Sequence, residues 1–355
     1  MTTHSEQPHE VLVRVYGRTD VGRSREHNED SFLVADLSSG RIALDERLAE
    51  HRLGGHGTIF MVADGLGGAA SGEIASKMAV DVVLTELRKR WVATDGTDPV
   101  AFAAALKGAT ETANARIHAY AVQHPEHRGM GTTATIAGLL GETLYVVQIG
   151  DSRAYLLRDG VLQQITKDQS LIQRLVEAGE ITLEEAEQSE RRNIILQALG
   201  PEAAVKIDLT HQPIRRGDAL VLCTDGLSGL IKRDDMARIA TEEPDLSTAC
   251  DMLVDMANEN GGPDNITVII ARFVGGGLRR ATDEDSVGHT VYSISGLMGT
   301  ATPPRPMARA RGPSAAAASG TTPRPVPYLA RGNTPYILAF VATLLVAIYL
   351  LITKL

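Results

Sequence analysis

The sequence has few aromatic residues and almost no cysteine. Phe, Trp and Tyr together make up 4% of the 355 residues, so the core has to be built mainly from Ala, Val, Leu and Ile. The two cysteines, Cys223 and Cys250, stand in apolar or helical contexts and lack the spacing of metal ligands. We therefore expect buried thiols in a reducing compartment.

The main part of the chain also lacks a basic balance. The net charge is −9, and the residues before position 276 carry 27 basic and 41 acidic side chains. Because binding to a phosphate backbone needs a basic footprint, nucleic acid is not an expected partner. The acidic excess instead favours a local cluster that binds cations. The N-terminus has no apolar signal region, so we expect no secretion of the folded part.

Apolar residues are abundant enough, at 43%, for a sizeable core. Strand-like runs and helix-like pairs are segregated along the chain instead of alternating, which predicts an α+β domain with an antiparallel core. This domain is expected over residues 11–274, after a flexible N-terminus of residues 1–10, with a mobile flap at about residues 168–199. The predicted strands are 11–16, 32–35, 60–63, 132–139, 143–149, 154–158, 205–209, 219–223 and 266–273. The predicted helices are 72–91, 98–123, 171–178, 183–188, 235–240 and 247–258.

Residues 275–334 differ in kind from this domain. They hold seven of the fifteen prolines and many Gly, Ser and Thr residues, which predicts a flexible linker. The next uncharged stretch would span roughly 26 Å as a helix, so residues 335–353 are predicted to cross a membrane, with a short tail at 354–355. Arg324 and Arg331 precede it, and the positive-inside tendency then predicts a single-pass protein of the cell membrane with a cytoplasmic main domain.

Three of the apolar runs end at an acidic residue. The run Phe60–Ala63 leads to Asp64, the run 219–223 leads to Asp225, and a third run ends at Asp151. An unpaired charge at the rim of a core is costly, so Asp64 requires a cation. If the three strand ends converge, their carboxylates form an oxygen-rich cluster suited to hard divalent ions such as Mg²⁺ or Mn²⁺.

Six short motifs follow one another along the chain, and as an ordered set they are highly specific. They are Arg-x-x-Asn-Glu-Asp (25–30), Val-Ala-Asp-Gly-Leu-Gly-Gly (62–68), Gly-Thr-Thr (131–133), Gly-Asp-Ser-Arg (150–153), Thr-Asp-Gly-Leu (224–227) and Gly-Pro-Asp-Asn (262–265). From about residue 20 to residue 268 this series resembles the metal-dependent protein serine/threonine phosphatases, the PPM or type 2C family, and the whole chain resembles a bacterial membrane-anchored member. The resemblance implies an antiparallel β-sandwich flanked by helices on both sides, in α-β-β-α layers, with metal ions in the cleft between the sheets.

The resemblance also implies the residues of a two-metal site. Asp64 would bridge two Mn²⁺ or Mg²⁺ ions, and Asp30 would orient Glu29 and bound waters. A third ion near the flap is implied for bacterial members, held by Asp151 and Asp225. The implied metal ligands are Glu29, Asp64, Gly65 through its carbonyl, Asp225 and Asp264, with Asp151 at the third ion.

The chemistry expected of such a site is attack on phosphorus by a metal-activated water. Arg25 is the expected phosphate clamp, since a guanidinium can bond two phosphoryl oxygens at once. No covalent intermediate is needed, so Cys223 is not expected to be a nucleophile. Some relatives carry a histidine after the Asp-Gly pair, where this sequence has Leu66, so a metal-bound water or one of two other histidines has to serve as the acid. Those two are His27 and His56.

We therefore expect a hydrolase acting on phosphoserine and phosphothreonine in proteins. Tethering to a membrane raises the effective concentration near other membrane proteins, so transmembrane serine/threonine kinases and their substrates are the expected partners. The alternative is a non-catalytic scaffold of the same fold that binds phosphoproteins. Such a scaffold should lack at least one metal ligand, whereas all the implied carboxylates are present. A phosphatase that controls a regulatory partner, such as an anti-sigma antagonist, shares the chemistry and differs only in substrate.

Overall fold

The structure is a computed structural model that describes residues 10–43, 50–67, 71–94, 96–182, 185–186, 189 and 194–294. The predicted membrane helix at 335–353, most of the predicted linker and most of the predicted helix at 183–188 lie outside these residues. Within the described residues, no helix combines the length and the apolar character needed to cross a membrane.

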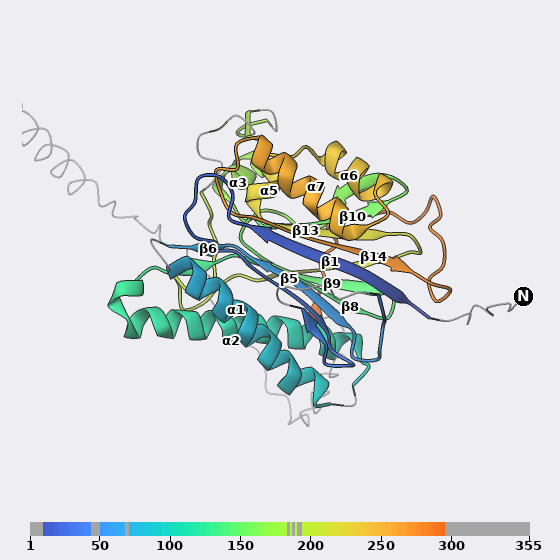
Figure 1. The fold of residues 1–355 in the computed structure, drawn as a ribbon. Coiled ribbons are helices and arrows are strands. Elements are labelled where there is room, and N and C mark those ends of the chain that lie inside the picture. Colours follow the sequence, from blue (N-terminus) through green and yellow to red (C-terminus); the bar gives the residue numbers. More distant parts are fainter. Residues whose placement is uncertain are drawn as a thin grey trace, which may run out of the picture. The chain divides into compact units, whose positions relative to one another are not determined.

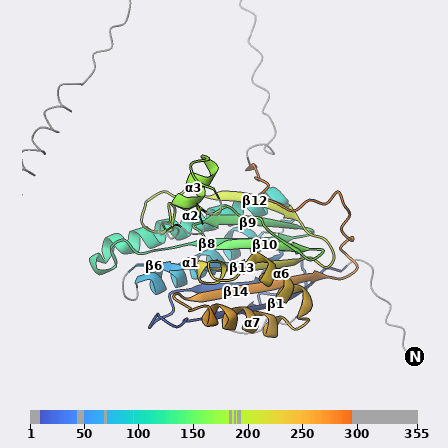
Figure 2. The ribbon, with the colours of Figure 1, turned by 90° about the horizontal axis from the view of Figure 1, so that it is seen from above.

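The described strands form two six-stranded sheets in which every pairing is antiparallel. The first sheet contains β1 (Leu12–Asp20), β4 (His51–Arg52), β10 (Arg153–Arg158), β11 (Val161–Gln164), β13 (Ala219–Cys223) and β14 (Ile266–Val274), in the order β11-β10-β13-β14-β1-β4. The second contains β2 (Ser31–Asp36), β3 (Ile42–Ala43), β5 (Thr58–Ala63), β8 (Ala134–Leu140), β9 (Thr143–Ile149) and β12 (Asp208–Pro213), in the order β12-β9-β8-β5-β2-β3. Strands of both sheets run in similar directions, as in an aligned sandwich (Figure 2).

Helices cover both outer faces of the sandwich. The helices α1 (Ser71–Leu87) and α2 (Pro99–Gln123) lie on one side, and α6 (Arg233–Glu242) and α7 (Leu246–Glu259) lie on the other (Figure 1). Shorter elements are β6 (Gly65–Leu66), β7 (Gly131–Thr132), η1 (Arg88–Val92), η2 (Pro125–His127), α3 (Leu171–Glu177) and α5 (Asp225–Ser228). The predicted α+β class with an antiparallel core is confirmed, and the layers follow the α-β-β-α order.

Three layers of buried apolar side chains hold these four layers together. One lies between the sheets, where the rings of Phe60 and Phe273 meet edge to face with centroids 6.4 Å apart. A second lies under α1 and α2 and includes the fully buried Trp91. The third lies under α6 and α7 and buries both cysteines, and burial raises the pKa of the Cys223 thiol to about 12. Cys223 is therefore a packing residue, as expected.

The flap is closed at its base by pairing between its two ends. The Leu171 amide donates to the Ile194 carbonyl at 2.9 Å, and the Leu196 amide donates to the Gln169 carbonyl at 2.7 Å. The Gln169 side chain also donates to Asp208 at 2.9 Å and accepts from the Gly150 amide at 3.0 Å. This glutamine therefore fixes the start of the flap to the second sheet.

The compact unit continues beyond β14, where the sequence predicts the linker to begin. Leu278 is buried between the sheets, and the Tyr292 amide donates to the Leu209 carbonyl at 2.9 Å. Asp285 forms ion pairs with Arg215 at 2.7 Å and with Arg279 at 2.6 Å. In Figure 2 this orange segment runs from the end of β14 across to the edge strand β12. We call residues 275–294 the post-sheet segment.

Candidate functional site

Antiparallel register places the predicted acidic residues at one end of the two sheets. In β1 and β14, Asp20 is opposite Ile266, so the loop after β1 lies beside the loop before β14. In β2 and β5, Ser31 is opposite Ala63, which puts Asp30 beside Asp64. Neighbouring strands bring further acidic residues to the same end of the sheets.

Strands β10 and β13 bring two more carboxylates to the same end. Arg153 in β10 is opposite Cys223 in β13, so Asp151 and Asp225 lie next to each other just beyond the paired residues. A side chain on Gly226 would have no room, because its Cβ would lie 2.0 Å from the Asn265 carbonyl oxygen. The close backbone approach at this glycine is what lets the loop before β14 reach the Asp225 turn.

Four predicted site residues line one pocket of about 290 Å³. They are Arg25, Asp151, Asp225 and Asp264. The pocket wall is completed by Arg153, Asp168, Gly226, Ser228, Gly229, Leu230 and Pro263. One of the predicted metal-site carboxylates in this wall, Asp151, is 94% buried. A small pocket with this density of carboxylates is suited to a cation.

Asp64 joins this group through Asp225. The two carboxyl groups lie close enough to influence each other's pKa. Burial raises the pKa of Asp64 well above its usual range, and the neighbouring Asp30 and Asp225 carboxylates raise it further. The backbone of Asp64 is fixed on both sides: its amide donates to Thr133 Oγ1 at 2.9 Å, and its carbonyl accepts from Thr132 Oγ1 at 2.8 Å.

Glu29 and Gly65 lie together beside this pocket and are not part of its wall. A Cβ on Gly65 would lie 2.5 Å from the Glu29 carbonyl oxygen, and a Cβ on Gly72 would lie 2.7 Å from Glu29 Oε2. Burial raises the pKa of Glu29, while Arg25 lowers it. The Glu29 amide donates to Asn265 Oδ1 at 2.8 Å, so the loop before β14 holds this glutamate in place.

Asp30 is buried and held by one of its two oxygens. Its Oδ2 accepts from Thr224 Oγ1 at 2.9 Å and from Thr267 Oγ1 at 2.6 Å. Burial raises its pKa to about 7, against the two threonine hydrogen bonds. Asp30 does not line the pocket, and its predicted role in orienting Glu29 and bound waters stays a prediction.

Three buried carboxylate oxygens have no hydrogen-bond partner in the described residues. They are Oδ1 of Asp30, of Asp151 and of Asp225. A buried acceptor without a partner is costly, and a buried carboxylate without one is more so. Burial raises the pKa of Asp151 to about 7, and the carboxylates of Asp225 and Asp168 add to the rise. These oxygens fit a hard divalent cation, which prefers anionic oxygen ligands.

Arg25, the predicted phosphate clamp, forms an ion pair with one of the predicted metal ligands. Its Nη2 donates to Asp264 Oδ2 at 2.7 Å, and its side chain is 50% exposed at the mouth of the pocket. That hydrogen bond raises the pKa of Arg25. The guanidinium therefore has further N–H groups directed to solvent beside the carboxylates.

The side chains are not yet arranged as a complete metal-binding shell. Among the described residues, no group of three or more His, Cys, Asp or Glu side chains converges closely enough to hold a metal ion. The ion pair between Arg25 and Asp264 occupies a carboxylate oxygen that a cation would take.

The two histidines proposed as alternative acids differ in place. His56 Nε2 donates to the Thr94 carbonyl at 3.1 Å, and its ring meets the ring of Trp91 in η1 edge to face. It lies in neither the pocket wall nor the loop of Glu29, so it does not serve as the acid. His27 stands in the loop of Glu29 and acts on the pKa of that residue, so it stays a candidate.

Several positioning residues had motif positions in the sequence but no predicted role. Thr133 bonds Ser152 at 2.8 Å and thereby connects the Asp64 and Asp151 turns. Arg153 donates to Asp168 at 2.7 Å and so closes one side of the pocket. Their signal in the sequence was their place inside the Gly-Thr-Thr and Gly-Asp-Ser-Arg motifs.

Comparisons with known proteins cover the same part of the chain. Residues 28–266 match the family model described as Protein phosphatase 2C. The Serine/threonine phosphatase stp of Listeria monocytogenes is 36% identical over 253 residues, which are 71% of this chain and 93% of that protein. The crystal structure of the Mycobacterium tuberculosis serine/threonine phosphatase PstP/Ppp is similar with a TM-score of 0.61 at 35% identity, covering 74% of this chain and 98% of that one. A PstP catalytic domain in complex with two manganese ions is similar with a TM-score of 0.60 at 35% identity, covering 74% and 99%.

Proposed function

This chain belongs to the protein phosphatase 2C family, and on that premise we propose that it is a serine/threonine phosphatase that hydrolyses phosphoserine and phosphothreonine in proteins. The observation that carries the proposal is the convergence of five acidic residues at one end of the sandwich, with buried oxygens that lack a partner among the described residues. The named activity of the relatives points the same way.

The residues present fit the divalent metal ions of this family. The proposed ligands are Asp64, Asp225, Asp264, Glu29 and the Gly65 carbonyl, with Asp151 for a further ion. Raised carboxyl pKa values, together with buried oxygens that have no partner in the described residues, favour cation binding at this site. When bound, two such ions neutralise the carboxylates and activate the attacking water.

The protein's own residues supply binding and orientation. Arg25 stands at the pocket mouth, and a phosphoryl group entering there would receive two N–H bonds from its guanidinium. Asp264 keeps that guanidinium aimed at the pocket through their ion pair. Asp30, clamped by Thr224 and Thr267, fixes the loop that carries Glu29. The chain thereby positions the Arg25 guanidinium, the acids and their backbone before any substrate arrives.

Replacement of Asp64 tests the proposal. We expect Asp64→Asn to lower turnover of a phosphothreonine peptide with Mn²⁺ by about 100-fold or more, because one of the proposed anionic metal ligands would be lost. The matched control is Asp159→Asn. This variant makes the same chemical change in an exposed hairpin turn, and the φ of 50° at Asp159 suits asparagine. Unchanged turnover by Asp64→Asn, or equal losses in both variants, would refute the proposed site.

We further propose that residues 335–353 anchor the protein in the cell membrane with the phosphatase domain in the cytoplasm. The support is the uncharged run in the sequence and the arginines that precede it. Phosphorylated proteins are the proposed substrates, and membrane serine/threonine kinases the proposed partners. Membrane fractions from cells that produce the full chain or a chain ending at residue 334 would separate the cases: anchoring requires that only the full chain resists alkaline extraction.

A further inference from the structure

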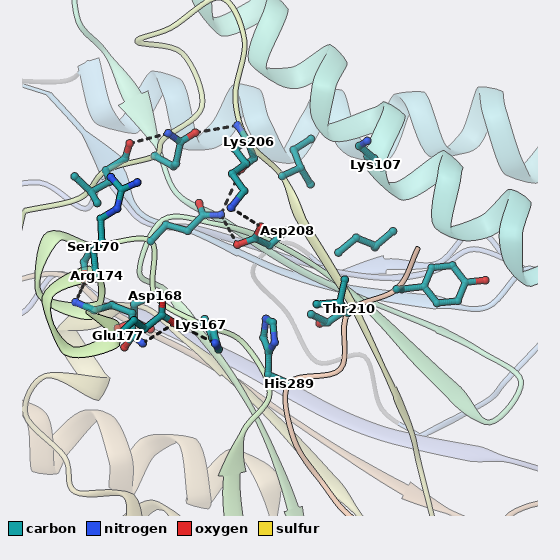
Figure 3. A pocket seen from close by; sticks show the side chains of 18 of the residues that line it. Lys107, Lys167, Asp168, Ser170, Arg174, Glu177, Lys206, Asp208, Thr210 and His289 are labelled. Atoms are coloured by element: carbon teal, nitrogen blue, oxygen red, sulfur yellow. Dashed lines mark hydrogen bonds and ion pairs between the residues drawn. The ribbon is translucent and has the colours of Figure 1, made fainter. Parts of the chain in front are cut away.

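A second and larger pocket lies beside the candidate metal pocket. It has a volume of about 930 Å³, which is in the upper part of the range for ligand sites. Its walls come from the flap, from β12 and from the post-sheet segment, and Lys107 of α2 reaches it from a fourth side. Figure 3 shows Lys107 and Lys206 on one side of this pocket, Arg174 at the flap side, and His289 opposite the two lysines. We call it the flap pocket.

The flap pocket and the metal pocket share a residue. Asp168 lines both, and it is held by Arg153, which belongs to the metal pocket alone. A chain that places its phosphorylated residue at the carboxylates can therefore pass Asp168 and continue into the flap pocket. An extended peptide advances by about 3.3 Å per residue, so only a few residues are needed to enter it.

In the flap pocket, more basic than acidic side chains lack a close ion-pair partner in the described residues. Asp168 is neutralised by Arg153 from outside, and Glu177 is paired with Lys167 at 3.0 Å. Arg174 has no ion pair within the described part of the chain.

Two of the three lysines of the pocket, Lys107 and Lys206, are only loosely paired. The contact between Lys107 and Glu111 is 3.7 Å long on the exposed surface of α2. Lys206 lies 3.6 Å from Asp208, whose carboxylate also accepts from Gln169. Lys107, Arg174 and Lys206 are thus available to an anionic ligand.

The rest of the pocket is apolar and suits a peptide better than a bare anion. Leu196 of the flap, Ile207 before β12 and Tyr292 of the post-sheet segment contribute to its walls. Burial lowers the pKa of His289, and Lys167 lowers it further, so this histidine is neutral near pH 7. The post-sheet segment lies outside residues 28–266, which the family model matches. This wall is therefore a feature of the chain beyond the shared family core.

We infer that the flap pocket binds an acidic segment of the protein substrate, a few residues away from the phosphorylated side chain. The inference rests on the proposed function and adds a determinant of substrate choice to it. The chain's own C-terminal part does not suit the pocket, because residues 286–355 contain no Asp or Glu and carry arginines. Charge complementarity thus selects a partner with acidic side chains and some apolar ones.

Steady-state kinetics of the full chain with Mn²⁺ test the inference. Three phosphothreonine peptides of equal length carry Glu and Leu about three to six residues before the phosphothreonine, the same residues after it, or Gln in place of Glu. We expect the wild-type protein to have a lower KM for at least one acidic peptide than for the neutral one. The double variant Lys107→Glu/Arg174→Glu should raise that KM by about three- to tenfold per reversed charge at low salt.

Two controls separate this inference from the proposed function. Arg116→Glu reverses a charge on the same helix nine residues further on, which at about 100° per residue is the opposite face of α2. It should leave the preference for acidic peptides unchanged. Hydrolysis of para-nitrophenyl phosphate, which is too small to reach the flap pocket, should be equal in all variants.

The outcomes are distinct. Equal KM values for acidic and neutral peptides in the wild type, or a preference that survives the double charge reversal, would overturn the inference while para-nitrophenyl phosphate turnover upholds the phosphatase. A nucleotide that abolishes the difference between the peptides at a lower concentration than a phosphate-free acidic peptide would also overturn it. No hydrolysis of any substrate by the wild-type protein would instead refute the proposed function.

Discussion

The metal-free protein should become less stable as the pH rises from 6 to 8. Asp30 and Asp151 are 94% buried, and burial raises the pKa of each to about 7. In the unfolded chain both carboxyls titrate near pH 4. The folded state therefore binds protons more tightly, so the associated stability is complete below about pH 4 and is lost as the pH rises through about 7.

The size of the effect follows from proton linkage. A carboxyl with a folded pKa of about 7 loses about 1.4 kcal/mol of stability between pH 6 and pH 8. Both groups interact with Asp225, so we expect about 1 to 3 kcal/mol for the pair. For a domain of this size, each kcal/mol corresponds to about 2 to 4 °C in the melting temperature. Metal-free protein should thus melt several degrees lower at pH 8 than at pH 6.

Thermal unfolding followed by circular dichroism, with EDTA or with Mn²⁺, measures this. Mn²⁺ competes with protons for the same oxygens, so it should raise the melting temperature most at pH 8 and flatten the pH dependence. Asp30→Asn should remove part of the metal-free slope, whereas Asp159→Asn in its exposed turn should leave it unchanged. A metal-free melting temperature that is equal or higher at pH 8, or a slope that Mn²⁺ does not alter, would refute the reasoning.

Three further predictions follow from single contacts. Arg25→Ala should lower kcat/KM for para-nitrophenyl phosphate by about 10- to 100-fold, with Arg25→Lys intermediate, because charged hydrogen bonds to the phosphoryl group are lost; equal kinetics of all three proteins would contradict this. Asp218→Ala should lower the free energy of unfolding, measured by urea denaturation, by about 3 to 5 kcal/mol, because it leaves the buried Arg158 without its ion-pair partner. Removal of one partner from an exposed pair, such as Lys167 and Glu177, should lower it by less than about 1 kcal/mol. Gly226→Ala should weaken Mn²⁺ binding measured by calorimetry, since its Cβ would lie 2.0 Å from the Asn265 carbonyl oxygen, while Gly55→Ala, with open space around it, should bind normally.

The sequence could predict the candidate site because its signals are local. An apolar run that stops at an acid marks the end of a buried strand, and Asp64, Asp151 and Asp225 all lie at such ends. The convergence itself depends on antiparallel register between distant strands, which local patterns do not carry. The order of the motifs supplied that information through the family resemblance.

The sequence could not predict what depends on partners far along the chain. The apolar run at 205–209 predicts a strand, but β12 is shifted to Asp208–Pro213 and includes the buried polar residues Thr210 and Gln212. Gln212 is satisfied by the post-sheet segment, where its Oε1 accepts from the Gly288 amide at 3.0 Å. A segment whose composition predicts a linker thus provides hydrogen bonds to β12. A short window of sequence cannot reveal this, because Gln212 and Gly288 are 76 residues apart.

The sequence also could not predict the shortest strands. Strand β11 has two exposed positions and one buried position among its four residues, and this pattern is too short to distinguish from a loop. The segment 38–57, between β2 and β5, has no predicted helix or strand. Its two short strands, β3 and β4, do not pair with each other, and each extends the edge of a different sheet.

Two acids of the site, Asp30 and Asp64, are held in place by the scaffold without an ion pair to a basic side chain in the described residues. Asp30 gives one oxygen to two threonine hydroxyls and keeps the other without a partner in the described residues. Asp64 is held through its backbone by Thr132 and Thr133, so its carboxylate is left to other groups. A more complete set of hydrogen bonds would stabilise the metal-free fold and would occupy the oxygens that a cation needs. The three buried apolar layers make this incomplete satisfaction tolerable, because they stabilise the strands independently of the charge at their ends. The same distribution that makes the metal-free protein sensitive to pH is therefore what leaves the site ready for a dication.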